Sequence, residues 1–405
     1  MVSQQSRLSL ATGQIRGQWR VAVWSLTLLT AVLLAGCDTG ATPLVPTPQP
    51  PAATPQLLGI TVEPVEGASP EAGTPQPGPT EEPTRIFDES LPAWTVMVYS
   101  SADNPAWTYA WDGVNQMEAA GASNQVQVLA AVDWPDGNER TGSLPARYVI
   151  RGNNDPDVIT SEEAVGAEET NFGDPELLAD FISWAQETHP ANHYALILDG
   201  YGSGWRGCCL DMDPATAEPY DYLSLDEIVS ALETAGISAD TPLDTIAFSG
   251  SMMGQLDVFQ AIAPYADYAV ASAAPIPAGG WDYQTLLGSL YANPWMDGRE
   301  WAETATTDYV AYNRDLLGNE FVSMTAVDLS QVTGLSTAVE TLAIALMNDQ
   351  TGAVGAAADA RRGAQPYGSI LTGIDEDVTA VDLGHAAAIL ADRSESVEIS
   401  VAAAR

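Results

Sequence analysis

Short apolar runs alternate with amphipathic stretches through the middle of the chain, and this pattern predicts strands separated by helices. The apolar runs are rich in β-branched and aromatic residues and are bounded by turn-forming residues, as is typical of strands. They are Trp94–Ser100, Val126–Val132, Tyr194–Leu198, Thr245–Phe248 and Tyr268–Ser272. Because the runs are largely apolar, we expect both faces of the strands to be covered, which indicates a mostly parallel sheet with helices on both sides.

Helix-start signals follow several of these strands. Asp174 and Pro175 fit the N-cap and the first position of a helix, and Ser224 with Glu227 fits a capping box. The helices are expected over residues 111–120, 174–187, 224–235 and 252–263. An irregular insertion is expected between the second strand and the helix that begins at Asp174.

The first 36 residues resemble an export signal. Three arginines precede a run of sixteen mostly apolar residues, Val21–Gly36, which is shorter than the ~20 residues of a spanning helix and fits a secretory signal. Leu34-Ala35-Gly36-Cys37 resembles the lipobox of bacterial lipoproteins, in which a cysteine after the cleavage point carries the lipid. The alternative is an ordinary signal peptide followed by an accidental cysteine. We expect a signal peptide over 1–36, a lipid on Cys37 and an extracytoplasmic location at the cell membrane.

Residues 37–92 are predicted to form a tether. Twelve of the 27 prolines of the chain lie between Asp38 and Thr84. Such a segment buries too little apolar surface to fold and favours extended, partly polyproline II conformations. A proline-rich ligand for a binding module is the alternative interpretation.

The charge of the chain excludes some partners. It has 54 acidic and 14 basic residues, a formal net charge of −40, and all its basic residues are arginine. A polyanion repels phosphate backbones, so we expect no nucleic-acid partner. The same repulsion disfavours adhesion to anionic lipids, so contact with a membrane is expected only through the lipid anchor.

Two glycine-containing loops follow neighbouring strands. Asp199–Trp205 comes directly after the strand that ends at Leu198, and Ser249–Gly254 comes directly after the strand that ends at Phe248. Sites in parallel sheets lie at the carboxyl ends of strands, and glycines there allow another chain to approach the backbone closely. The alternative is that both loops are simply tight turns between a strand and a helix.

Several segments, in the same order, resemble the clostripain family of cysteine peptidases. They are Trp94–Asn104, Val128–Asp133, Pro190–Trp205, Phe248–Val258, Pro264–Tyr268 and Gly280–Tyr283. The resemblance implies a caspase-like α/β three-layer sandwich with a mostly parallel sheet over residues 93–283. An α-rich C-terminal extension over 284–405 is expected to pack on the same domain. In the family, a Cys–His dyad lies at neighbouring strand ends.

The chain departs from the family at the functional positions. The family motif His-Gly-x-Gly-Trp corresponds to the segment beginning at Tyr201, and Phe-Asp-Ala-Cys-Leu-Met-Gly corresponds to Phe248–Gly254. Tyr201 therefore takes the histidine position and Ser251 takes the cysteine position. Ser249 replaces the aspartate that lines the family's pocket for a basic P1 side chain. Together with these three positions, Gly202 and Gly250 are the expected site residues, with Ser249 and the two glycines in substrate binding.

The sequence offers no obvious base for Ser251. A serine nucleophile needs a positioned base, tyrosine with a reference pKa near ~10 is a poor one, and the chain contains no lysine. His193 precedes the strand that leads to Tyr201 and should lie roughly 25 Å from that residue at ~3.3 Å per residue. His189 is further back, and His385 falls in a helical stretch near the C-terminus. None of the three histidines is expected to assist Ser251.

Cys208 and Cys209 are the other nucleophile candidates. Arg206 is the one nearby cation that could favour a thiolate. The interpretation we favour is a vicinal disulfide or a pair of buried thiols.

An acidic loop follows the two cysteines, and it contains Asp211, Asp213, Glu218, Asp221 and Asp226. It lacks the spacing of an EF-hand. Because clostripain family members can use calcium, calcium at this loop is the alternative to a solvated loop. We expect no metal or cofactor.

Taken together, these features predict a surface-anchored, catalytically degenerate homologue that binds peptide or protein through the retained cleft. The alternatives are an active extracellular hydrolase that uses Ser251 with an unrecognised base, and a paralogue whose cleft has no function.

Overall fold

The computed structural model describes residues 87–135, 145–166, 170–212, 219–277, 279–317, 322–370 and 378–405. Asp88–Arg405 fall within one compact unit of the chain. The predicted signal peptide, Cys37 and nearly all of the predicted tether lie outside the described residues.

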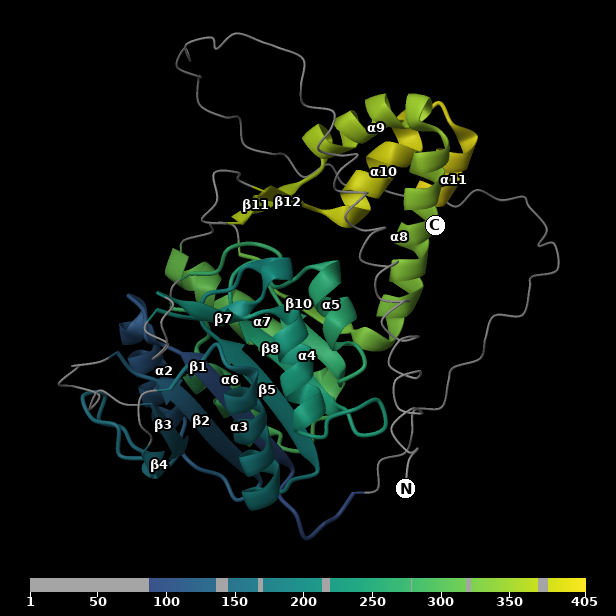
Figure 1. The fold of residues 1–405 in the computed structure, drawn as a ribbon. Coiled ribbons are helices and arrows are strands. Elements are labelled where there is room, and N and C mark those ends of the chain that lie inside the picture. Colours follow the sequence, from purple (N-terminus) through teal and green to yellow (C-terminus); the bar gives the residue numbers. More distant parts are fainter. Residues whose placement is uncertain are drawn as a thin grey trace, which may run out of the picture. The chain divides into compact units, whose positions relative to one another are not determined.

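An eight-stranded mixed sheet forms the centre of the described structure (Figure 1). Its strands are β1 (Trp94–Ser101), β2 (Val126–Asp133), β3 (Ala146–Val149), β4 (Glu162–Gly166), β5 (His193–Asp199), β8 (Leu243–Ser249), β9 (Ala266–Ala271) and β10 (Thr325–Asp328). They are arranged in the order β10-β9-β8-β5-β1-β2-β3-β4. The five central strands run parallel, and β10, β3 and β4 are antiparallel to their neighbours. The predicted mostly parallel sheet is confirmed.

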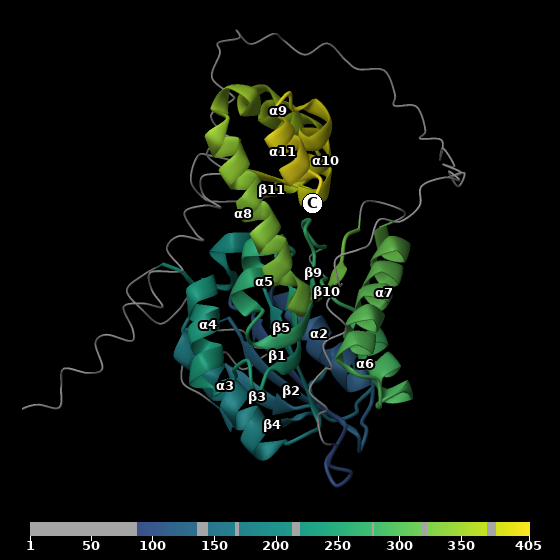
Figure 2. The same cartoon turned by 90° about the vertical axis from the view of Figure 1, so that its right-hand side faces the viewer.

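Helices cover both faces of this sheet (Figure 2). One face carries α2 (Trp107–Ala119), α6 (Tyr283–Ala292) and α7 (Gly298–Leu317). The other face carries α3 (Pro175–Thr188), α4 (Leu225–Thr234) and α5 (Leu256–Ile262). Successive residues of β1 point to opposite sides, with Val96 and Val98 in the first core and Met97 and Tyr99 in the second. The predicted three-layer α/β sandwich is therefore confirmed.

Two helix-start signals have the expected geometry. The Asp174 side chain accepts a hydrogen bond from the Glu176 amide at the start of α3. At the start of α4, Ser224 and Glu227 make both hydrogen bonds of the capping box. These contacts satisfy amides that have no partner within the first helical turn.

Three element predictions were wrong in detail. α2 begins at Trp107, four residues before the expected start. α5 begins at Leu256 and not at residue 252, because Met252 has a left-handed backbone conformation (φ 66°) that a helix cannot include. The segment predicted to be an irregular insertion contains β3 and β4, which extend the sheet by two antiparallel strands.

The C-terminal part is rich in helices. It contains α8 (Val332–Asn348), α9 (Gln350–Gly363), α10 (Leu383–Arg393) and α11 (Val397–Ala403), with the hairpin β11 (Pro366–Ile370) and β12 (Val378–Val381). These helices share a core that includes Leu342, Leu346 and Leu390. The stretch Leu329–Asn348 is long and apolar enough to cross a membrane, and 39% of it is buried within the protein. Leu342 and Leu346 of this stretch pack in the helical core, whereas Leu335, Ile344 and Met347 are exposed.

Candidate functional site

The carboxyl ends of three neighbouring strands bring polar side chains together. Ser100 at the end of β1 pairs in register with Asp199 on β5, and Asp199 pairs in register with Ser249 on β8. Because these strands are parallel, the three residues lie side by side at the same edge of the sheet. Ser249 is therefore buried beside a carboxylate on the adjacent strand.

The two glycine loops that follow β5 and β8 are packed against each other. A Cβ atom on Gly202 would overlap the backbone of Gly250 and Ser251, at 2.8 Å from the Gly250 carbonyl carbon. A Cβ atom on Gly250 would lie 3.2 Å from the Gly200 carbonyl oxygen. Glycine at both positions allows this close approach of the two loops. The structure thus brings the segments containing Tyr201 and Ser251 together.

A cavity of about 110 Å³ lies at these strand ends. Its described lining is Ser100, Ser101, Ala102, Asn104, Ala106, Tyr109, Ala110, Asp199, Gly200, Tyr201, Ser249, Ser251, Ile276, Pro277, Gly279, Gly280 and Tyr283. Three of the predicted site residues, Tyr201, Ser249 and Ser251, therefore share one cavity.

Ser251 is half-buried and has a single hydrogen-bond partner. Its Oγ accepts a hydrogen bond from the Ile276 amide at 3.0 Å. Among the described residues, no carboxylate or imidazole hydrogen-bonds to this hydroxyl. The residue that follows, Met252, holds the left-handed conformation noted above, a strained state for a side chain with a Cβ atom. The chain thus keeps an unusual turn directly after Ser251.

Tyr201 points outward from the same cavity edge. It is 48% exposed, and its hydroxyl makes no hydrogen bond with any residue that the structure describes. In a nucleophile–base pair, a third group normally orients the base. Among the residues that the structure describes, no such group holds Tyr201.

Asp199 is a functional candidate that sequence reasoning missed. The Ser100 hydroxyl donates a hydrogen bond to its Oδ2 at 2.7 Å. Burial raises the pKa of Asp199, while the Ser249 and Ser100 hydroxyls act in the opposite direction by stabilising the carboxylate. Burial and the nearby Asp199 also raise the pKa of Tyr283, which lines the same cavity. The spacing of the sequence could have indicated Asp199 as a site residue, because it precedes Tyr201 by two residues just as Ser249 precedes Ser251.

Comparison with known proteins decides the family. The profile of the Peptidase C11 group, described as the clostripain family, matches residues 98–390, well over half of the chain. The chain belongs to the clostripain family. No curated protein sequence matches the chain.

Two solved structures of clostripain-type proteases share the fold. A secreted C11 cysteine protease from Bacteroides thetaiotaomicron, in complex with an irreversible peptide inhibitor, matches with a TM-score of 0.53 and 19% identity, covering 69% of this chain and 74% of that one. An inactive zymogen C11 protease from Parabacteroides distasonis matches with a TM-score of 0.57 and 18% identity, covering 79% of this chain and 82% of that one. At these identities the likeness shows the fold.

The three histidines of this clostripain family member lie away from the cavity. His193 is at the amino end of β5, where its Nδ1 lies 2.7 Å from Asp244 Oδ1 and its ring stacks on Trp94. His189 caps the end of α3. His385, in α10, accepts a hydrogen bond from the Gln365 amide. None of them is among the residues that line the cavity.

The two adjacent cysteines are buried free thiols with their sulfur atoms 3.3 Å apart. They belong to β6 (Cys208–Asp211), which pairs with β7 (Asp221–Leu223). The hydrogen bond with Cys208 and burial raise the pKa of the Cys209 thiol. A raised thiol pKa disfavours the thiolate that a nucleophile needs. Of the two structural interpretations, the structure has buried thiols.

Two carboxylates of the acidic loop accept hydrogen bonds within the protein, whereas Asp226 is exposed in the first turn of α4. Asp211 Oδ2 accepts a hydrogen bond from the Phe172 amide at 2.8 Å, and Asp221 Oδ2 accepts one from Asn171 Nδ2 at 2.7 Å. Asp213 and Glu218 lie outside the described residues. Among the residues that the structure describes, no group of three or more His, Cys, Asp or Glu side chains has the arrangement of a metal site.

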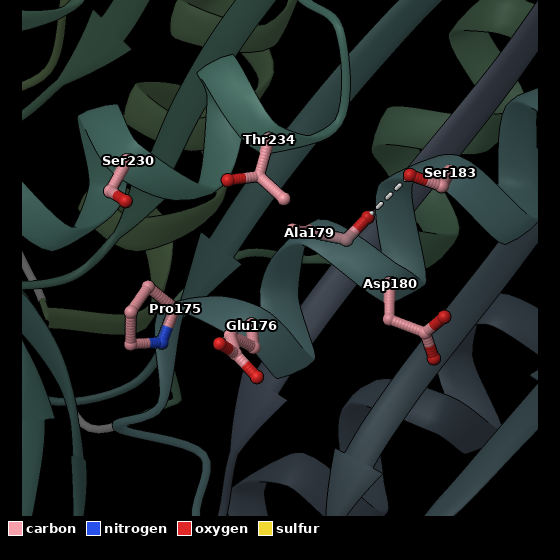
Figure 3. Close-up of a pocket in the computed structure, with 7 residues that line it drawn as sticks. All are labelled: Pro175, Glu176, Ala179, Asp180, Ser183, Ser230 and Thr234. Atoms are coloured by element: carbon pink, nitrogen blue, oxygen red, sulfur yellow. Dashed lines mark hydrogen bonds between the residues drawn. The ribbon is translucent and has the colours of Figure 1, made fainter. Parts of the chain in front are cut away.

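A second hollow, of about 420 Å³, lies between α3 and α4 (Figure 3). The Ser183 hydroxyl on its wall donates a hydrogen bond to the Ala179 carbonyl within α3. Asp180 forms an ion pair with Arg147 at 2.6 Å. The Ser183 hydroxyl and the Asp180 carboxylate therefore already have partners within the protein. We take the cavity at the strand ends as the better candidate site.

Proposed function

We propose that this protein is a catalytically degenerate member of the clostripain family that binds peptide or protein segments through its retained cleft. One observation carries the proposal. The Ser251 hydroxyl shares a cavity with Tyr201, and its single hydrogen bond is to the Ile276 amide. The position of the nucleophile is present without the groups that would activate it.

The chemistry disfavours hydrolysis by Ser251. General-base catalysis requires a group within about 2.6–3.2 Å of the proton that it removes, or one water away. Asp199 is the carboxylate of the cavity wall, but its hydrogen bond is to Ser100. The raised pKa of the Cys209 thiol removes the second nucleophile candidate.

Two features support peptide binding. Gly200 and Gly202 leave half-buried backbone beside the cavity, and an extended peptide recognises accessible backbone through main-chain hydrogen bonds. The Bacteroides relative was solved with an irreversible peptide inhibitor, so that protein of the same fold binds a peptide ligand. The proposed binding needs no metal or cofactor.

The proposed location is the extracytoplasmic face of the cell membrane. It rests on the lipobox-like segment ending at Cys37 and on the proline-rich segment behind it. The same Bacteroides protease is a secreted protein. The lipid is the one proposed membrane contact, and the net charge of −40 disfavours nucleic acid.

Activity-based labelling separates the binding function from the hydrolase alternative. The purified full chain is treated with a fluorophosphonate and with iodoacetamide, and turnover of Arg- and Lys-containing peptides is followed, alongside Ser251→Ala. We expect no fluorophosphonate adduct at position 251 and no turnover. Turnover that disappears in Ser251→Ala would overturn the proposal, because a functional nucleophile contributes orders of magnitude in rate.

A further inference from the structure

A third cavity lies between α3 and the strands β1, β2 and β3. Its volume is about 180 Å³. Its described lining shares no residue with that of the cavity at the strand ends. It is therefore a separate site from the one to which the proposed function is assigned.

Aromatic rings form part of the wall of this cavity. Tyr99 of β1 stacks on Phe172 with 4.6 Å between the ring centroids, and Phe181 of α3 lies 6.0 Å from Tyr99 by the same measure. The Tyr99 hydroxyl donates a hydrogen bond to the Phe172 carbonyl at 3.1 Å, so it already has a partner. An apolar cavity of about 150 Å³ is large enough for benzene. The cavity therefore has the size and the lining for a single aromatic ring.

A guanidinium group lines the same cavity. The Arg147 side chain is only 14% exposed, and its Nη2 donates a hydrogen bond to Asp180 Oδ2 at 2.6 Å. The guanidinium carbon also lies 5.6 Å from the centroid of the Trp184 ring. Among the described residues, Asp180 is the one hydrogen-bond partner of this side chain, whereas a guanidinium has five N–H donors. The remaining donors can bind a carboxylate, whose two oxygens match the planar fork of an arginine.

A buried hydroxyl adds a second polar group. Thr170 lines the cavity, and its Oγ1 is buried without a hydrogen bond to any residue that the structure describes. A buried polar group without a partner lowers stability, and a carboxylate oxygen would accept a hydrogen bond from this hydroxyl. Asp180 is the one exposed residue of the described lining. The side of the cavity that holds the Arg147–Asp180 pair is therefore the side that faces solvent.

We propose that this cavity binds a small monocarboxylic acid that carries one aromatic ring. The ring packs among Tyr99, Phe172 and Phe181, Arg147 binds the carboxylate, and Thr170 donates a further hydrogen bond to it. A drug-sized ligand needs at least ~300 Å³, so the ligand is a free acid with a single ring. The net charge of −40 repels anions over long range. Selectivity therefore depends on direct contact with Arg147, which salt screens less than it screens distant charges.

The test measures binding to the full chain at pH 7 by isothermal titration calorimetry and by saturation-transfer NMR of the ligand. The probes are phenylacetate, its neutral amide phenylacetamide, and acetate, which keeps the charge and lacks the ring. We expect phenylacetate to bind about tenfold or more tightly than phenylacetamide, as for a charge-assisted hydrogen bond. Acetate should bind at least about tenfold more weakly than phenylacetate, because it buries almost no apolar surface.

Variants separate the charge, the hydroxyl and the space. Arg147→Met removes the charge and keeps an unbranched side chain, so the preference for phenylacetate over phenylacetamide should be lost. Arg299→Met is the matched control, because it breaks an ion pair with Glu303 at 2.9 Å on α7 but does not line the cavity. Thr170→Val should weaken phenylacetate binding severalfold. Ala131→Leu fills the cavity from β2 and should abolish binding of both ring-containing probes.

A melting curve establishes that each variant is folded before it is titrated. If Arg147→Met does not fold, Thr170→Val and Ala131→Leu still decide whether the acid binds in this cavity. No binding of phenylacetate at millimolar concentration would overturn the proposal, and so would equal affinity for phenylacetate and phenylacetamide. Binding that persists in Ala131→Leu would place the ligand elsewhere and also overturn it. The proposed peptide binding uses the other cavity and should be unchanged in these variants, so each proposal can fail without the other.

Discussion

At the scale of single residues, Asp199 lines the candidate site, and desolvation of its carboxylate lowers the stability of the folded protein. Burial raises its pKa above the value in the unfolded chain, whereas a carboxylate held by an ion pair has a lowered pKa. The folded protein therefore binds this proton more tightly than the unfolded chain does. The contribution of Asp199 to stability is therefore largest at low pH. It is lost as the pH rises from the pKa of this aspartate in the unfolded chain through its raised pKa in the folded protein.

This cost predicts that Asp199→Asn stabilises the protein at neutral pH. Asparagine keeps an oxygen that accepts the hydrogen bond from Ser100 but carries no charge to be desolvated at this half-buried position. We expect the melting temperature at pH 7 to rise by on the order of 1–4 °C. The difference should shrink as pH falls through ~3.9, because below that pH the aspartate becomes protonated in the unfolded chain as well as in the folded protein. Differential scanning calorimetry across pH provides the measurement, and a lower melting temperature at pH 7 would show that the carboxylate is structurally required.

Individual residues also set the limit of what could be predicted. Tyr201, Ser249 and Ser251 were found because family motifs mark their positions. Asp199 was missed because its candidacy depends on its register with β8 and on the lack of an ion-pair partner among the described residues. Neither property can be predicted from the sequence alone. Its position directly after an apolar strand was the available signal.

At the scale of elements, the buried parallel strands were predictable and the edges of the sheet were not. Central strands are apolar on both faces, so their runs are continuous in sequence. β3 alternates buried and half-buried residues over only four positions, Ala146–Val149, too few for a clear period. The start of α5 could not be read either, because Met252 adopts a conformation that a side chain of its type rarely takes.

The contact between the two glycine loops predicts that a dyad can be rebuilt. Tyr201→His with Ser251→Cys should place an imidazole near a thiol, because Gly202 lies directly against Gly250 and Ser251. A thiolate–imidazolium pair has a thiol pKa well below the ~8.5 of an ordinary cysteine. We expect position 251 to react with iodoacetamide at least about tenfold faster at neutral pH in the double variant than in Ser251→Cys alone.

The measurement is the rate of labelling at position 251 as a function of pH, followed by mass spectrometry of the peptide. Cys208 and Cys209 are buried, so their labelling reports unfolding and serves as an internal control. If the single and double variants label alike with a pKa near 8.5, the side chains of the two loops do not converge, and the proposed descent from a Cys–His site loses its geometric support.

At the scale of the whole molecule, the binding unit and the proposed anchor are separate in sequence. The fold, the cleft and the C-terminal helices lie within Asp88–Arg405, and the lipobox-like segment ends at Cys37. The proline-rich composition between them predicts an extended spacer, which at ~3.1 Å per residue would reach well over 100 Å. The proposed binding domain would gain from such an arrangement, because a spacer would let it reach ligands while the proposed lipid keeps it attached.

This arrangement predicts that membrane association depends on one atom, the Sγ of Cys37. Expressed with its signal in a bacterial host, the full chain should partition with membranes, and its N-terminal peptide should carry the mass of a lipid. Cys37→Ser should move the protein to the soluble fraction or leave the signal uncleaved, since serine provides no thiol for the lipid. Thr39→Ala, which keeps Cys37 and changes a neighbouring residue, is the matched control and should behave like the unaltered chain. An unchanged membrane fraction and mass in Cys37→Ser would contradict the anchor. The apolar helix Leu329–Asn348 would then be the next segment to test.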